Sequence, residues 1–146
     1  MHNVFVYGTL KRGFPNHHLM PEAEFRGTAR TSDRLPLVIA GKWCTPILIA
    51  ASGGHRVNGE VYGVDDDGLS CLDDLEGNGR ELGFDRIDVE VDLSGAWTIA
   101  FTYVMPRDRI YVIHSEPLEE YQLDPRYVSG HQRGQPSSGF GSPSPD

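Results

Sequence analysis

Val4-Phe5-Val6-Tyr7-Gly8-Thr9-Leu10-Lys11 is the stretch of sequence that decides the fold. Its consecutive apolar and aromatic residues predict a strand that is buried on both faces. A glycine and a hydroxyl residue follow directly, so the backbone turns sharply where this strand ends. Backbone N–H groups in such a loop can hold a small anion such as a carboxylate. A plain strand-to-loop turn explains the same residues equally well.

Further strands are predicted downstream from runs of apolar residues and from strict alternation. The predicted strands are 25–34, 35–39 (interrupted by Pro36), 46–50, 57–64, 87–93 and 97–103. The turn Ser52-Gly53-Gly54 predicts that 57–64 returns alongside 46–50. Apolar and polar residues alternate on both sides of Ser94-Gly95, which predicts a hairpin.

One helix is predicted after Asp65-Asp66-Asp67, whose carboxylates can accept hydrogen bonds from the free N–H groups of a helix start. Leu69, Leu72 and Leu75 form its apolar stripe. Gly77 is the residue type that commonly follows a helix end. Together these elements predict an α+β fold, a small mixed β-barrel of about six short strands with one clear helix.

The chain of 146 residues has the length of one domain. Residues 1–133 are predicted to form that domain, and we expect it to be catalytic. From residue 134 to residue 146 the sequence is mostly Gln, Pro, Ser and Gly. Such a segment cannot bury enough apolar surface to offset its ordering entropy, so it is predicted to be a disordered polar tail.

A net charge of −8 argues against nucleic acid or an anionic membrane as the main partner. Cys44 and Cys71 make no disulfide framework and are predicted to be buried thiols in a reducing compartment. No signal peptide and no membrane-spanning segment can be recognised. We therefore expect a monomer in the cytosol.

Nucleotide and metal sites are not supported by the motifs. Gly8 and Gly13 match half of a phosphate-binding loop, but Phe14-Pro15 occupies the positions of the required lysine and hydroxyl residue. His17-His18 are adjacent, so their side chains point apart, and a surface loop is predicted there. Asp88, Glu90 and Asp92 alternate with apolar residues, as in a strand with a solvated face. We expect no cofactor and no metal.

Three acids crowd the predicted end of the helix: Asp73, Asp74 and Glu76. Helix ends favour basic residues, because their carbonyl groups already carry partial negative charge. Like charges and the helix dipole would both raise a carboxylate's pKa towards the range useful for a general base. A solvated acidic face explains Asp73 and Asp74. Glu76 stands at the exit of the helix beside glycines, where it is a candidate base, although a structural role stays open.

Separated motifs, taken in order, resemble the gamma-glutamylcyclotransferase-like family. They are Val4 to Gly13 with Pro15-Asn16-His17 close behind, then Gly59-Glu60-Val61-Tyr62, then Leu72-Asp73-Asp74-Leu75-Glu76-Gly77. Pro36 to Gly41 is similar, more particularly, to the gamma-glutamylamine branch of that family. The likeness covers residues 3 to 105.

This resemblance implies a lyase-type enzyme with a small mixed barrel and no cofactor. Family members cleave a γ-glutamyl amide by internal attack, releasing 5-oxoproline and a free amine. The gamma-glutamylamine branch acts on γ-glutamyl-ε-lysine, the cross-link left when transglutaminase-joined proteins are degraded. The family roles give Glu76 as proton acceptor, and Tyr7, Gly8, Thr9 and Leu10 as the loop that holds the γ-glutamyl group.

One departure from the family concerns Phe84-Asp85-Arg86, where relatives commonly show Tyr-x-Arg. A hydroxyl is therefore absent at this position. Two alternatives remain beside the gamma-glutamylamine activity. One is a related cyclotransferase acting on γ-glutamyl amino acids or glutathione, and the other is a catalytically silent protein that binds a γ-glutamyl ligand.

Overall fold

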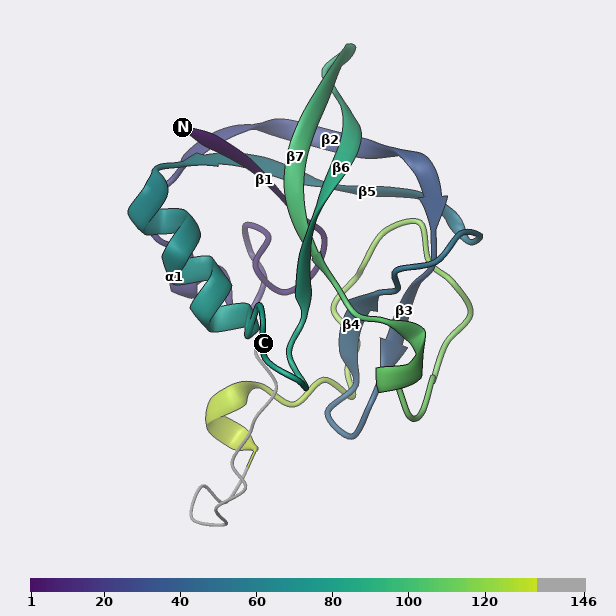
Figure 1. The fold of residues 1–146 in the computed structure, drawn as a ribbon. Helices are drawn as coiled ribbons and strands as arrows, with labels where there is room; N and C mark the ends of the chain where they lie inside the picture. Colours follow the sequence, from purple (N-terminus) through teal and green to yellow (C-terminus); the bar gives the residue numbers. More distant parts are fainter. Residues whose placement is uncertain (134–146) are drawn as a thin grey trace.

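Strands dominate the computed structural model, which describes residues 1–133 (Figure 1). The strands are β1 (His2–Val6), β2 (Glu24–Leu35), β3 (Leu37–Ala40), β4 (Thr45–Leu48), β5 (His55–Val64), β6 (Asp85–Leu93) and β7 (Ala96–Val104). The helix is α1 (Asp66–Glu76), and short 3-10 turns occur at η1 (His17–Leu19), η2 (Arg107–Arg109) and η3 (Gly130–Gln132). The predicted tail, residues 134–146, lies outside the described residues.

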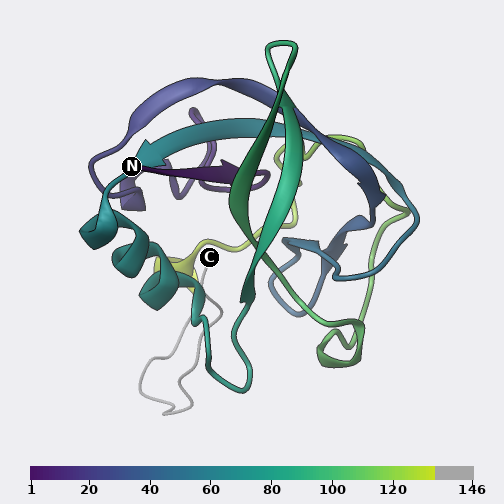
Figure 2. The same ribbon diagram turned by 45° about the horizontal axis from the view of Figure 1, so that its top comes forward.

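A closed barrel forms the centre of the molecule, with the strand order β1-β5-β2-β6-β7. Neighbours in this order are antiparallel, and the barrel closes where β7 lies parallel to β1, with Val4 opposite Phe101. In both views α1 lies on one side of the barrel and the small β3–β4 sheet on the other (Figures 1 and 2). The predicted α+β barrel is confirmed.

Strand β1 is apolar from Val4 to Val6, where it contributes to two cores. Val4 and Val6 belong to the cluster that includes Leu69 and Leu72 of α1. Phe5, between them, points to the other side and joins the second cluster. Successive side chains of a strand point to opposite faces, so both faces of β1 are covered, as the sequence predicts.

The ends of α1 follow from the residues that flank it. The Asp65 side chain accepts a hydrogen bond of 2.8 Å from the Gly68 N–H and caps the first turn. At the other end, Gly77 adopts a left-handed conformation with φ of 71°, which a side chain would disfavour. The structure thus confirms both the predicted helix and the predicted hairpin, which is formed by β6 and β7.

The predicted pairing of 57–64 with 46–50 is wrong. Strand β4 pairs with β3, whereas β5 lies between β1 and β2. Ser52-Gly53-Gly54 connects β4 to β5, but a local turn signal does not determine which strand lies alongside. Pro36, which has no N–H, separates β2 from β3. Of the two cysteines, Cys44 is buried as predicted, whereas Cys71 is exposed.

Candidate active site

The loop after β1 begins with Tyr7, which fixes its direction. The Tyr7 hydroxyl donates a hydrogen bond of 2.7 Å to the backbone carbonyl of Tyr103 in β7. At Gly8 an added Cβ would lie 2.8 Å from Cγ of Pro46. Real Cβ atoms essentially never approach that closely, so the β4 strand requires a glycine at this position.

Asn16 holds the middle of the same loop. Its backbone N–H donates to the Thr9 carbonyl at 2.9 Å, and its side-chain Nδ2 donates to the Thr9 hydroxyl at 3.0 Å. The same Nδ2 lies 3.1 Å from the Tyr127 hydroxyl. His17 Nδ1 lies 2.9 Å from the Leu10 carbonyl, so this partly buried histidine contacts the loop, whereas His18 is exposed, as expected of a surface segment.

Glu76 is the last residue of α1, and only 6% of its surface is exposed. Its carbonyl accepts a hydrogen bond of 2.9 Å from the Phe84 N–H, which closes the loop that follows the helix. Gly83 approaches Gly77 so closely that an added Cβ would lie 2.0 Å from the Gly77 carbonyl oxygen. The glycines therefore hold Glu76 against the barrel instead of letting it extend into solvent.

A single cavity brings together every site residue predicted from the sequence. It is lined by Tyr7, Gly8, Thr9, Leu10 and Glu76, and also by Phe5, Val6, Pro46, Phe84 and Tyr103. Its volume is about 30 Å³, room for one or two water molecules. Phe84, the position at which relatives commonly carry a tyrosine, therefore lines this cavity.

Tyr103 and Asp73 extend the site in a way that the sequence does not reveal. The Tyr103 hydroxyl donates to Asp73 Oδ1 at 2.7 Å, and Arg86 pairs with Asp73 Oδ2 at 2.7 Å. Burial raises the pKa of the Tyr103 phenol, and the hydrogen bond to Asp73 and the charges of Asp73 and Glu76 raise it further. The interpretation of Asp73 as part of a merely solvated face is therefore wrong.

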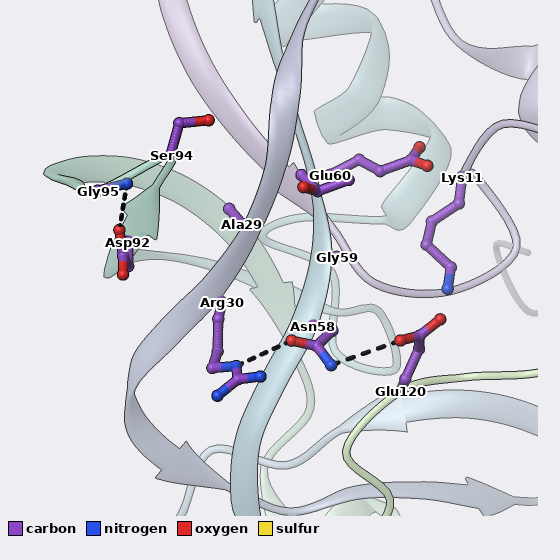
Figure 3. A pocket seen from close by; sticks show the side chains of 11 residues that line it. Lys11, Ala29, Arg30, Asn58, Gly59, Glu60, Asp92, Ser94, Gly95 and Glu120 are labelled. Carbon is purple, nitrogen blue, oxygen red and sulfur yellow. Dashed lines mark hydrogen bonds between the residues drawn. The ribbon is translucent and has the colours of Figure 1, made fainter.

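A larger cavity of about 400 Å³ lies elsewhere, over β2 and β5 (Figure 3). It contains none of the residues from Tyr7 to Leu10 and lacks Glu76. Figure 3 shows its polar chain, in which Arg30 donates to Asn58 at 3.0 Å and Asn58 donates to Glu120 at 3.4 Å. Side chains of both charges line it, and Lys11 among them donates to the backbone carbonyl of Tyr121 at 3.0 Å.

Comparison with known proteins decides the family. The sequence model described as "Gamma-glutamyl cyclotransferase, AIG2-like" matches residues 4–125, most of the chain. The chain belongs to the gamma-glutamyl cyclotransferase, AIG2-like family. A gamma-glutamylaminecyclotransferase of Rattus norvegicus is 51% identical over an alignment of 83 residues, and the match covers 53% of this chain and 56% of the relative. The corresponding human protein is 51% identical over 79 residues, 50% of this chain and 52% of the relative.

These aligned segments span about half the length of the curated relatives. A solved structure covers more of the fold of this AIG2-like chain. The crystal structure of an AIG2-like protein from Mus musculus has a TM-score of 0.74 and 35% identity, over 84% of this chain and 88% of that one. A structure named gamma-glutamyl cyclotransferase shares the fold at 23% identity, with a TM-score of 0.61, over 77% of this chain and 69% of that one.

Residues 1–133 were also compared with what a metal site and a membrane-spanning helix require. Within residues 1–133, no group of three or more His, Cys, Asp or Glu side chains is arranged to hold a metal ion. None of the helices in this part of the chain is long and apolar enough to cross a membrane.

Proposed function

We propose that this family member is a γ-glutamylamine cyclotransferase that converts γ-glutamyl-ε-lysine, derived from degraded transglutaminase cross-links, into 5-oxoproline and free lysine. The observation that carries the proposal is the shared cavity of Glu76 and the Tyr7–Leu10 loop. These residues come from distant parts of the sequence, and the fold places a buried carboxylate against a loop of backbone dipoles. The names of the relatives favour an amine as the leaving group.

Glu76 serves as the proton acceptor in this proposal. The carboxylate takes a proton from the substrate's α-ammonium, and the freed nitrogen attacks the γ-carbonyl carbon. A bond then forms between the α-nitrogen and the γ-carbon, and the bond from that carbon to the lysine nitrogen breaks. The proton held by Glu76 passes to the departing nitrogen. The attacking nitrogen loses a second proton as the lactam forms, and this proton also passes through Glu76 to the departing nitrogen, so the lysine side chain leaves as an ammonium. The enzyme returns to its starting state and no co-reactant is consumed.

The Tyr7–Leu10 loop holds the γ-glutamyl group for this reaction. Among backbone hydrogen bonds of residues 1–133, none is donated by Gly8 or Leu10. Their N–H groups suit a carboxylate or a developing oxyanion, which backbone donors stabilise in an enclosed site. Ring closure is intramolecular, and holding the reacting groups together removes much of the entropic barrier. The rigid attachment of the loop through Asn16 supports that role.

The proposal predicts that Glu76→Gln loses most turnover. The purified protein is incubated separately with γ-glutamyl-ε-lysine, γ-glutamyl-alanine and glutathione, and 5-oxoproline is measured. We expect activity on the first substrate, and a loss of roughly 10²–10⁴-fold in the variant because the base is gone. Calorimetry should still detect substrate binding, since the amide of glutamine keeps the shape of the side chain.

Glu90→Gln is the matched control, because this exposed carboxylate on β6 lies outside the cavity. It undergoes the same chemical change and should keep the activity of the parent protein. Near-normal turnover in Glu76→Gln would contradict the role of Glu76. Failure of the parent protein on all three substrates would contradict the enzymatic proposal and favour a silent γ-glutamyl-binding protein.

A further inference from the structure

A second cavity of about 400 Å³ adjoins the Glu76 cavity, and the proposed mechanism does not yet use it. Phe84 lines both cavities. Along the end of α1, Glu76 faces the small cavity while Leu75 and Gly77 line the large one. The two spaces therefore meet at the residue that carries the proposed base.

Strand β4 shows the same division. Pro46 lines the small cavity, and its neighbours Thr45 and Ile47 line the large one. Opposite faces of β4 thus line the two cavities, since side chains alternate along a strand. An amide placed beside Glu76 would lie next to Phe84, the residue that also lines the larger space.

The large cavity has apolar walls. Trp43, Ile47, Leu75, Phe84 and Met105 are among its lining residues. Its volume lies in the range of small-molecule sites, about 300–1,000 Å³. An alkyl chain matches such walls better than a charged or strongly hydrated group does.

Cations, and no carboxylates, lie among the side chains that line this cavity: Lys42, Arg80 and Arg109. Arg109 is already engaged, because it donates to the Gly83 carbonyl at 2.6 Å and lies 3.3 Å from Asp85. Lys42 and Arg80 are exposed, and neither forms an ion pair within residues 1–133. The ammonium of Lys42 lies 4.8 Å from the centre of the Trp43 ring.

We propose that this cavity receives the leaving amine, and that Lys42 and Arg80 select amines whose alkyl chain ends in a carboxylate. The inference rests on the cyclotransferase activity proposed above and specifies its substrate class. The apolar walls take the alkyl chain, and the exposed cations attract the distal carboxylate. An α-amino group beside that carboxylate stays in solvent at the rim, so ε-linked lysine fits this description.

The test compares substrates that differ only at the far end of the amine. The probes are γ-glutamyl-ε-aminocaproate, which ends in a carboxylate, and γ-glutamyl-hexylamine, which has the same chain length and no charge. We expect the parent protein to have a higher kcat/KM for the acid. In Lys42→Glu and in Arg80→Glu, the kcat/KM of the acid divided by that of the uncharged probe should fall by about tenfold at low salt. The change should lie mainly in the KM of the acid, because the new carboxylate repels the carboxylate of the probe.

Arg34→Glu is the matched control, since it makes the same change of charge at an exposed residue that does not line the cavity. Its substrate ratio should equal that of the parent protein. A ratio that is unchanged in both Lys42→Glu and Arg80→Glu overturns the inference. If the parent protein releases 5-oxoproline from γ-glutamyl-ε-lysine but from neither probe, the inference fails and the cyclotransferase proposal stands. If it releases 5-oxoproline from none of the three compounds, the cyclotransferase proposal fails. Calorimetry then measures the affinity of each probe for the parent protein and the variants, and the ratio of the two affinities tests the selectivity without turnover.

Discussion

Tyr103 places a phenol between the proposed base and an ion pair. Its hydroxyl donates to Asp73, which is also bound by Arg86, and its ring lines the cavity that contains Glu76. Because burial and the neighbouring negative charges raise the pKa of Tyr103, this phenol keeps its proton where an ordinary tyrosine ionises. The Asp73 charge is thus held by two donors at one turn's distance from Glu76.

Tyr103→Phe removes this hydroxyl, and we expect the free energy of unfolding to fall by about 1.5 kcal/mol, the contribution of a hydrogen bond to a charged group. Below pH 10, the usual pKa of tyrosine, the stabilisation is fully present. As the pH rises above that value, the unfolded chain releases the proton and the folded protein keeps it, so the stabilisation is lost. Urea unfolding of variant and parent should therefore converge at alkaline pH.

Tyr111→Phe serves as the control for this measurement, because Tyr111 is 85% exposed. Its stability should differ from that of the parent by less than about 0.5 kcal/mol at every pH. An equal, pH-independent loss in both variants would contradict the role given to the Asp73 hydrogen bond.

Single residues differ in how far the sequence could predict them. Glu76 could be singled out, because an acid at a helix end contradicts the helix dipole and lies next to glycine. Tyr103 could not, because it continues an ordinary alternation along a strand. The contacts of Asp73 could not be predicted for a related reason: its partner Arg86 lies on β6, and the local sequence gives no sign of that pairing.

At the scale of elements, the loop between α1 and β6 controls how Glu76 is presented. Gly77 ends the helix in a left-handed conformation, and Gly83 packs against the Gly77 carbonyl. The Phe84 N–H then donates back to the Glu76 carbonyl at 2.9 Å. Helix end, loop and cavity wall form one connected structure, so a change in the loop is transmitted to the candidate base.

Gly83→Ala should destabilise the protein by about 2–3 kcal/mol, because the new Cβ would lie 2.0 Å from backbone and the loop must move. Turnover should fall as well, since the loop also carries Phe84. Thermal unfolding and 5-oxoproline release measure the two effects. Gly130→Ala is the matched control, with no heavy atom within 4 Å of the added Cβ, and a similar loss there would contradict the steric explanation.

Helix α1 and the β6–β7 hairpin could be predicted because their signals are local: a cap, an apolar stripe, a glycine, and strict alternation around a turn. The partner of β4 could not be predicted, because its turn residues fit several pairings. The closure of the barrel could not be predicted from local signals either, because β7 pairs with β1, a strand far away in the sequence.

On the scale of the whole molecule, the segment after β7 packs against residues Lys11 and Phe14, which follow the candidate substrate loop. Lys11 Nζ donates to the Tyr121 carbonyl at 3.0 Å, and the Phe14 and Tyr121 rings lie 5.7 Å apart. Tyr121 has no exposed surface. The C-terminal part of the domain therefore supports the loop that follows the first strand. The division of the chain at residue 133 stays a prediction.

Tyr121→Ala should lower the free energy of unfolding by about 3–5 kcal/mol, because it empties a fully buried aromatic site. Leu123→Ala, two residues away, is the control, since Leu123 is 53% exposed and should cost less than about 0.5 kcal/mol. Chemical denaturation of both variants measures the difference. Similar small losses would show that the segment contributes little to the fold.

The small volume beside Glu76 also has a consequence for affinity. About 30 Å³ is smaller than a γ-glutamyl group, so the proposed substrate can lie wholly within this cavity only if its walls move apart. The apparent dissociation constant is then the intrinsic one divided by the fraction of molecules already open. If about one molecule in a hundred is open, binding is weakened about a hundredfold. A substitution that holds the walls apart would tighten substrate binding without adding a single contact.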